Sequence, residues 1–259
     1  MALIKRFKIK SFKKNNKIVE LKNISKSFGN RQVLNNISFN VGKGEILGIL
    51  GPNGAGKSTM LKILNGILEP NFGNVFINNV DCTDLPIYER ANKYRLGYLP
   101  QRGGAMFDLT LYENLLMVAE IHIKEKELRQ TKLENIISQF NFESISKIKA
   151  KNLSGGQFKR CVIAMALIND PQVLMLDEPF AALDILTIKM LQEVIVNLQT
   201  LKGISTVVVD HLARDLLQVT DRNLILSSEG NIVAEGSSEE IVNHKLAKEV
   251  YFGHEFKLK

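Results

Sequence analysis

Three short apolar runs along the chain predict a buried parallel sheet. They cover residues 45–50, 172–176 and 205–209. Apolar positions at helical spacing follow the first run at 57–64 and precede the second at 158–167. Short apolar strands that alternate with helices in this way are typical of α/β folds with parallel strands.

Two other stretches predict structure outside that sheet. Residues 18–41 and 73–79 read as short strands with turn breaks, so we expect them to form an antiparallel flank of the core. The pattern turns polar and helical at about 108–152, with 111–123 and 125–140 as the expected helices. We therefore expect a separate helical lobe at about 108–152.

Composition excludes several classes of protein. The apolar runs are far shorter than the ~20 residues that cross a bilayer, so we expect a chain that is soluble by itself. The two cysteines, Cys82 and Cys161, lack metal-ligand spacing, and the four histidines form no cluster. This usage indicates a reducing, cytoplasmic environment.

The positive charge is concentrated at the start of the chain. The formal net charge is +7, and seven basic residues precede the first acidic one, Glu20. They are Lys5, Arg6, Lys8, Lys10, Lys13, Lys14 and Lys17. The remainder is formally neutral, so no nucleic-acid partner is expected. We expect residues 1–17 to be a flexible basic extension; the alternative is contact with an anionic membrane leaflet, at about 1 kcal/mol per basic residue.

A glycine-rich motif follows the first apolar run and opens the first helix. It consists of Gly51, Pro52, Asn53, Gly54, Ala55, Gly56, Lys57, Ser58 and Thr59. This strand–loop–helix setting is that of a P-loop, whose backbone N–H groups point at a polyphosphate. Lys57 would reach the β- and γ-phosphates, and Ser58 would supply a hydroxyl to Mg²⁺. The motif therefore predicts binding of ATP or another nucleoside triphosphate.

The second apolar run ends in two adjacent carboxylates, Asp177 and Glu178. A Walker B strand delivers charge to the P-loop pocket in this way, so Asp177 would hold the Mg²⁺ shell. Glu178 is the candidate general base that orients water; the alternative is a buried carboxylate with a structural partner. The adjacent Pro179 favours the first interpretation.

Between these motifs, Leu153 is followed by Ser154, Gly155, Gly156 and Gln157, at the start of a helical stretch. This pentapeptide resembles the signature motif of the ATP-binding cassette (ABC) family, whose nucleotide-binding domains drive transporters. The resemblance covers about residues 18–259. It implies a P-loop NTPase cassette with a RecA-like core, an antiparallel β subdomain and a helical subdomain at about 108–152. The last part, about 245–259, would form a C-terminal clasp.

Four further residues lie where that resemblance would place functional groups. Gln101 resembles the Q-loop glutamine that approaches the metal, and Asp184 the D-loop aspartate. His211 resembles the switch histidine that touches the γ-phosphate, and Phe28 the aromatic residue that stacks on adenine. Such stacking contributes about 1–3 kcal/mol. Taken alone, Phe28, Gln101 and His211 each have an ordinary structural reading; their order along the chain favours the functional one.

The resemblance also implies partners. The chain has one P-loop and one signature, so the second ATP site would come from another copy in a head-to-tail homodimer. Each ATP would lie between one P-loop and the signature residues of the other copy. Integral membrane permease subunits would bind the dimer at the cytoplasmic face of the inner membrane.

The end of the chain, residues 250–258, is similar to that of the ATPase subunits of bacterial lipopolysaccharide exporters. Residues 178–181 and 211–217 resemble them as well. Gln157, Ile185, Met106 and Phe107 depart from that pattern, the last two in the groove that receives membrane partners. Nearby, Arg102 and Tyr88 are candidates for replacement contacts. The alternatives are the ATPase of a branched-chain amino-acid importer, which has a related Tyr-x-Gly ending, and a soluble regulatory or repair ATPase.

Overall fold

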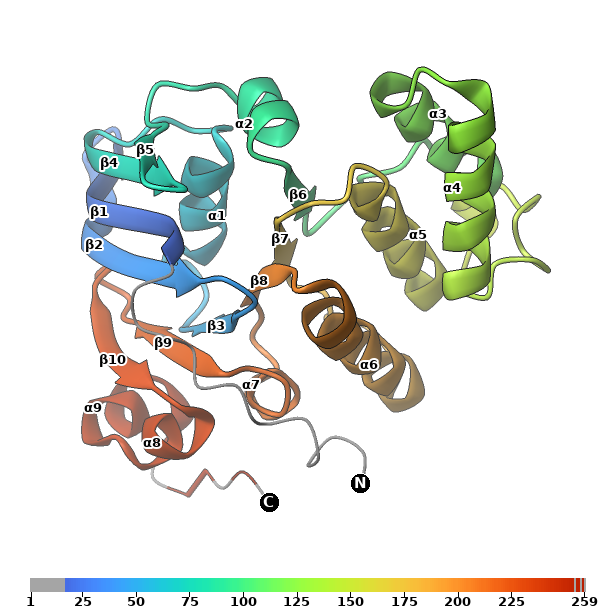
Figure 1. Ribbon diagram of the computed structural model, residues 1–259. Helices are drawn as coiled ribbons and strands as arrows, with labels where there is room; N and C mark the ends of the chain where they lie inside the picture. The colour runs from blue at the N-terminus through green and yellow to red at the C-terminus, as the bar shows by residue number, and fades with distance from the viewer. Residues whose placement is uncertain (1–16, 254, 257, 259) are drawn as a thin grey trace.

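The computed structural model of the protein describes residues 17–253, 255, 256 and 258, and Figure 1 shows its ribbon. Two sheets and a separate group of helices make up the molecule. Within the described part of the chain, no helix combines the length and the apolar character that a bilayer crossing requires.

A six-stranded sheet forms the centre, in the order β10-β9-β3-β8-β7-β6. All neighbours are parallel except β10, which is antiparallel to β9. Its strands are β3 (Ile46–Leu50), β6 (Leu96–Leu99), β7 (Val173–Asp177), β8 (Ser205–Val209), β9 (Arg222–Leu226) and β10 (Ile232–Gly236). Val209 is level with both Ile49 and Asp177, so the carboxyl ends of β3, β7 and β8 lie at one edge. The parallel sheet predicted from the three apolar runs is confirmed.

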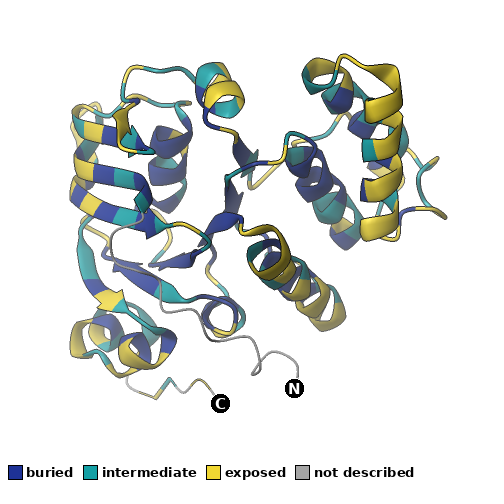
Figure 2. Ribbon diagram, in the orientation of Figure 1, coloured by how far each residue is buried: buried dark blue, intermediate teal, exposed yellow. Residues whose placement is uncertain are grey.

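Alternate side chains of these strands enter two different cores. In β3, Ile46 and Leu50 belong to one buried cluster, whereas Leu47 and Ile49 belong to the other. A strand that is buried on both faces reads as a continuous apolar run, which explains why the sequence pattern was so plain. Figure 2 shows the central strands as the most deeply buried part of the fold.

A four-stranded antiparallel sheet, in the order β2-β1-β4-β5, packs on one side. Its strands are β1 (Lys17–Phe28), β2 (Arg31–Gly42), β4 (Phe72–Ile77) and β5 (Val80–Asp81). The expected antiparallel flank is therefore present. Lys17 does not belong to an extension: it pairs with Gly42, and its Nζ donates to Glu20 Oε1 at 2.6 Å. The rest of the predicted basic extension lies outside the described residues.

Helices cover both faces of the central sheet (Figure 1). They are α1 (Lys57–Asn65), α2 (Ile87–Lys93), α3 (Leu111–His122), α4 (Lys126–Gln139), α5 (Gly155–Leu167), α6 (Ile185–Lys202), α7 (Ala213–Leu217), α8 (Ser238–Asn243) and α9 (Lys245–Ala247). A 3₁₀ turn covers Ala150–Asn152 and a π-helical turn Lys248–Phe252. Met60 and Leu61 of α1 are buried in the core shared with the antiparallel sheet.

The helices α3 and α4 stand apart from both sheets, with α5 between them and the core (Figure 1). The two helices expected at 111–123 and 125–140 are present, shorter by a residue or two at their ends. Thr110 begins α3 through a capping box with Glu113, which satisfies free backbone N–H groups of the first turn. Phe140 and Phe142 stack at 5.4 Å between ring centroids and belong to the core of this lobe.

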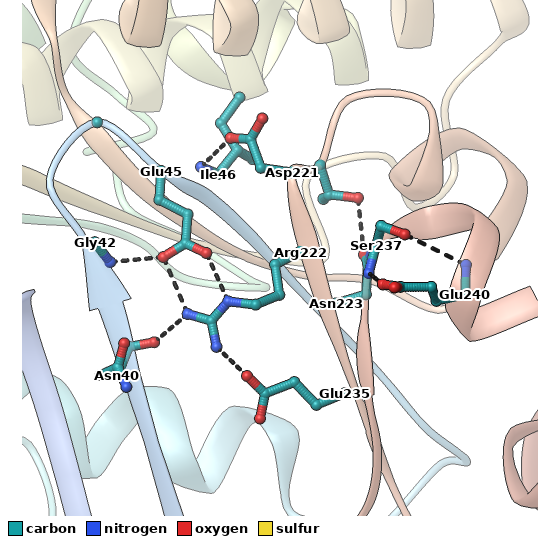
Figure 3. A network of polar contacts seen from close by, with 12 residues as sticks. Asn40, Gly42, Glu45, Ile46, Asp221, Arg222, Asn223, Glu235, Ser237 and Glu240 are labelled. Atoms are coloured by element: carbon teal, nitrogen blue, oxygen red, sulfur yellow. Dashed lines mark hydrogen bonds and ion pairs between the residues drawn. The ribbon is translucent and has the colours of Figure 1, made fainter. Parts of the chain in front are cut away.

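A polar network fixes the end of β3 that lies away from the P-loop (Figure 3). Arg222 donates to both carboxylate oxygens of Glu45, at 2.7 and 3.0 Å, and to the backbone oxygen of Asn40 at 2.6 Å. It also forms an ion pair with Glu235. The buried Glu45 accepts from the backbone N–H of Gly42 at 2.6 Å. One guanidinium thus connects β9 with β2, β10 and the residue that precedes β3.

Candidate active site

The P-loop joins β3 to α1 and packs against β2. A Cβ on Gly56, whose φ is +89°, would lie 2.6 Å from Leu34 Cδ2, so this position needs a glycine. Lys57 begins α1 and is buried; its Nζ donates to the backbone oxygens of Gly51 at 2.7 Å and Pro52 at 2.9 Å. The buried ammonium is therefore held inside the loop, where the predicted phosphates would bind.

Burial lowers the pKa of Lys57, while the carboxylates of Glu178, Asp177 and Asp210 act in the opposite direction. The ammonium of Lys57 thus has little hydration, and its positive charge is stabilised by nearby carboxylates instead. A phosphate group would supply the hydrogen-bond acceptors that water no longer provides, because charge-assisted bonds are strongest where the groups are desolvated.

Ser58 and Asp177 meet beside Lys57. The Ser58 Oγ donates to Asp177 Oδ1 at 2.9 Å, and the Tyr98 hydroxyl lies 3.4 Å from Asp177 Oδ2. Burial raises the pKa of Asp177, and the hydrogen bond from Ser58 acts against that rise. Across the described residues there is no group of three or more His, Cys, Asp or Glu side chains suited to a metal. A hydroxyl and one carboxylate suit Mg²⁺, which keeps waters and phosphate oxygens as its other ligands.

Glu178 follows β7 directly, with a backbone φ of +53°. Its Oε2 accepts from Gln101 Nε2 at 2.7 Å and lies 3.7 Å from His211 Nδ1. The Asp210 Oδ1 lies 3.6 Å from the same imidazole nitrogen. The structure therefore brings Gln101, Glu178 and His211 to one place. The sequence predicted them to act on the metal, the attacking water and the γ-phosphate, respectively.

Asp210 was not predicted as a site residue. It is fully buried, accepts from the backbone N–H groups of Phe180 and Leu212 at 2.9 Å each, and has its pKa raised by burial. The signal was present in the sequence, because Asp210 directly follows the apolar run 205–209, much as Asp177 ends the apolar run that precedes it.

Two other residues that contact the site were not predicted: Tyr98, beside Asp177, and Lys159, whose Nζ donates to the backbone oxygen of Glu178. Tyr98 lies within β6 and Lys159 within α5, and neither belongs to a motif used in the prediction.

The signature residues begin α5. Ser154 and Gln157 form a capping box: Ser154 N donates to Gln157 Oε1 at 2.9 Å, and Gln157 N donates to Ser154 Oγ at 3.3 Å. Ser154 and Gly155 are exposed, whereas Gly156 is buried against Thr187 of α6. Neither of the two capping hydrogen bonds reaches the P-loop of the same chain. The structure thus leaves Ser154 and Gly155 of the signature open toward solvent.

Asp184 and Phe28 are exposed at two different edges of the site. Asp184 caps α6, accepting from Thr187 N at 3.0 Å and from Thr187 Oγ1 at 2.6 Å. Phe28 ends β1, with 48% of its surface exposed. The Arg31 Nη2 lies 3.4 Å from where a Cβ on Gly54 would stand, so the side chain of Arg31, at the start of β2, borders the P-loop.

The residues predicted to receive membrane partners, or to replace those contacts, are all exposed. Met106, Phe107 and Tyr88 are 56%, 55% and 64% exposed, and Arg102 is exposed as well. Phe107 stacks on Phe158 of α5 at 5.6 Å between centroids. Phe107 thereby contacts the helix that carries the signature.

The comparison with protein families agrees with this geometry. The model described as "ABC transporter" matches residues 34–181, more than half of the chain. The chain belongs to the ABC transporter family. It is an ATP-hydrolysing cassette with an α/β fold, as its sequence predicted.

Individual relatives and solved structures extend the match to nearly the whole cassette. The lipopolysaccharide export system ATP-binding protein LptB of Haemophilus influenzae is 37% identical over 245 residues, 93% of this chain and 99% of that protein. A nucleotide-free ATP-binding cassette from an ABC transporter superposes with a TM-score of 0.83 at 30% identity, covering 92% of this chain and all of the other. A dimeric cassette in a post-hydrolysis state with ADP and phosphate superposes with a TM-score of 0.76 at 30% identity, over 85% of this chain and 98% of the other.

Proposed function

We propose that this cassette drives the extraction of lipopolysaccharide from the inner membrane and its export to the outer membrane. The observation that carries the proposal is the similarity to a lipopolysaccharide export ATP-binding protein along almost the full length of both chains. The resemblance of residues 250–258 to the end of such subunits supports the same assignment. ATP is the energy source, and the transported molecule would be contacted by membrane subunits.

We propose the following roles at the site. Lys57 binds the β- and γ-phosphates, within the backbone cradle of residues 51–59. Ser58 and Asp177 hold Mg²⁺, with Gln101 approaching it; the ion supplies positive charge to the phosphates when bound. Phe28 stacks on adenine. These roles agree with the hydroxyl–carboxylate pair at 2.9 Å and with the exposed ring of Phe28.

Hydrolysis would depend on Glu178 as general base. Its carboxylate accepts from Gln101 and lies near His211, so a water between Glu178 and the γ-phosphate would be oriented by groups already in place. His211 would contact the γ-phosphate. Positioning and charge neutralisation supply most of the catalysis in phosphoryl transfer, and this arrangement provides both.

We propose a head-to-tail homodimer in which Ser154, Gly155, Gly156 and Gln157 of one copy complete the ATP site of the other, with Asp184 at the interface. The exposure of Ser154 and Gly155 supports this, as do Ile185 and Leu186, which follow Asp184 and are 72% and 76% exposed. In this account residues 17–259 form one cassette, which begins with Lys17 of β1, with a helical subdomain at about 108–152 and a clasp at about 245–259. It is attached peripherally, through permease subunits, to the cytoplasmic face of the inner membrane, and needs no nucleic acid.

Co-purification tests the transport assignment. The tagged full chain is expressed in its native host, membranes are extracted in mild detergent, and the bound integral proteins are identified by mass spectrometry, with an untagged strain as control. Two different permeases with periplasmic domains, together with lipopolysaccharide retained in the inner membrane after depletion of the chain, are the expected results. Amino-acid permeases with a binding protein would overturn the assignment in favour of import, and the absence of any membrane protein would overturn it in favour of a soluble ATPase.

A further inference from the structure

Lys159 connects the signature helix with the candidate general base of the same chain. It lies on α5, five residues after Ser154 and so about 7.5 Å further along the helix axis. Its Nζ donates a hydrogen bond to the backbone oxygen of Glu178. This contact joins the helical lobe to the hydrolytic site within one chain.

The backbone of Glu178 has an unfavourable conformation, which hydrogen bonds from neighbouring residues can stabilise. Its φ of +53° lies in the left-handed region, which is unfavourable for a residue with a side chain. Its N–H donates to Val209 O at 2.7 Å, which holds it to β8. Its carbonyl accepts from Lys159 and, at 3.4 Å, from Ala181 N. Ala181 belongs to the same segment after β7 as Glu178, whereas Lys159 lies on α5. Lys159 therefore donates the hydrogen bond that the Glu178 carbonyl receives from a different element.

Charge explains why a cation stands there. Lys159 is partly buried, and the loss of hydration lowers its pKa. The negative charges of Asp210, Glu178 and Asp177 act in the opposite direction and raise the pKa. The same three carboxylates also raise the pKa of Lys57. The site thus has two lysines whose charged forms these carboxylates favour; Lys57 belongs to the P-loop and Lys159 to the signature helix.

The next residue shows that this orientation is specific to Lys159. The Arg160 Nη1 donates to the backbone oxygen of Phe140 at 3.1 Å, and its guanidinium lies 5.6 Å from the ring centroid of Phe142. Arg160 thus points into the helical lobe. Of the two adjacent basic residues, Lys159 alone contacts the hydrolytic site.

We propose that Lys159 is a positioning residue for hydrolysis: it fixes the backbone of Glu178 and so ties the alignment of the general base to the position of the signature helix. The inference rests on the role proposed above for Glu178. If Lys159 moves away with α5, the carboxylate loses its alignment although the P-loop still binds nucleotide. Lys159 therefore affects the rate of the chemical step and leaves ATP binding by the P-loop unchanged.

Steady-state hydrolysis by the purified full chain tests this inference, together with calorimetric ATP binding. Lys159→Met keeps the length of the side chain and removes the donor; Lys159→Arg keeps a charged donor. Lys126→Met, at the exposed start of α4, is the matched control in the same lobe. We expect kcat to fall about 10- to 100-fold in Lys159→Met, with KM and the Kd for ATP within about two-fold of the wild type. We also expect Lys159→Arg to recover most of the rate and the control to match the wild type.

Three results would overturn the inference: an unchanged kcat in Lys159→Met, a loss confined to KM, or a failure of Lys159→Arg to recover the rate. If Lys159→Met does not fold, as judged by its thermal midpoint, Lys159→Gln serves the same comparison. Glu178→Gln is measured in parallel. If Glu178→Gln is inactive while Lys159→Met is normal, the Lys159 inference alone fails; if Glu178→Gln hydrolyses normally, the proposed role of Glu178 fails.

Discussion

At the scale of single residues, the site is a small set of buried charges held by short polar contacts. Asp177 and Asp210 lose hydration at the ends of β7 and β8, and burial raises the pKa of each. Lys57 lies among these carboxylates, with its ammonium on two P-loop carbonyls. A nucleotide that enters the loop meets a cation already desolvated and oriented, so little reorganisation is needed on binding.

Replacement of Lys57 by alanine tests this arrangement. We expect the Kd for ATP to rise about 10- to 100-fold, because hydrogen bonds to charged groups contribute about 1.5–3 kcal/mol. Titration calorimetry measures the change, and Lys43→Ala, an exposed lysine before β3, is the control. Equal affinities of the two variants would contradict the role given to Lys57.

Several of the predicted site residues lie at the carboxyl ends of the central strands. Asp177 ends β7, Glu178 follows it directly, and His211 comes two residues after β8, and parallel strands bring these ends to one edge. Lys159 lies on α5, and its contact with Glu178 depends on how α5 packs beside the central sheet. No periodicity along the chain encodes that packing, so only the structure could place Lys159.

At the scale of elements, α5 and α6 approach each other closely at their N-terminal ends. The signature residues lie at the start of α5, and Asp184 of the D-loop directly precedes α6. A Cβ on Gly156 would lie 2.3 Å from Thr187 Cγ2, whereas one on Gly155 would lie 3.5 Å from Leu183 Cδ2, an ordinary contact. Thr187 in turn donates to Asp184, the cap of α6. The close approach of the two helices therefore depends on the glycine at 156.

The two glycines form a matched pair for a stability measurement. We expect Gly156→Ala to lower the free energy of unfolding by about 1–3 kcal/mol, because overpacking forces Thr187 out of place. Gly155→Ala should leave it unchanged or slightly higher, since alanine favours a helix. Urea denaturation measures both, and equal stabilities would show that α5 and α6 are not closely packed in solution.

The polar network around Arg222 leads to a second prediction about stability at the scale of elements. Arg222→Met leaves the carboxylate of Glu45, with only 6% of its side chain exposed, without its cation. We expect a loss of about 3–5 kcal/mol in the free energy of unfolding. Glu235→Gln removes the charge of a partner that is 47% exposed, and we expect a loss of about 0–1 kcal/mol. Chemical denaturation compares them, and similar losses would exclude Glu45 as the main partner.

At the scale of the whole molecule, the sequence predicted the class of fold and most of its elements, and the match to solved cassettes agrees. The central strands were predictable because they are buried on both faces, and α3 and α4 because the stretch at about 108–152 has a polar, helical pattern. The contact between the end of the chain and the site was not: the Tyr251 hydroxyl donates to the His211 backbone oxygen at 2.9 Å. These residues are 40 positions apart, and no local pattern indicates their pairing.

In the proposed homodimer, each copy contributes to both ATP sites. The P-loop edge of its sheet forms half of one site, and the exposed start of α5 forms half of the other. In the proposed mechanism, ATP brings two copies together, and hydrolysis with Glu178 as general base then ends the paired state. A variant that binds ATP and cannot hydrolyse it should remain paired.

The most direct test is the mass of Glu178→Gln in solution with ATP and Mg²⁺, measured by size-exclusion chromatography with light scattering alongside hydrolysis. We expect a stable dimer with ATP, a monomer without it, and turnover at least about 100-fold below the wild type, since general base catalysis typically contributes that much or more. Hydrolysis by Glu178→Gln at the wild-type rate, or a variant that binds ATP and stays monomeric, would contradict the account.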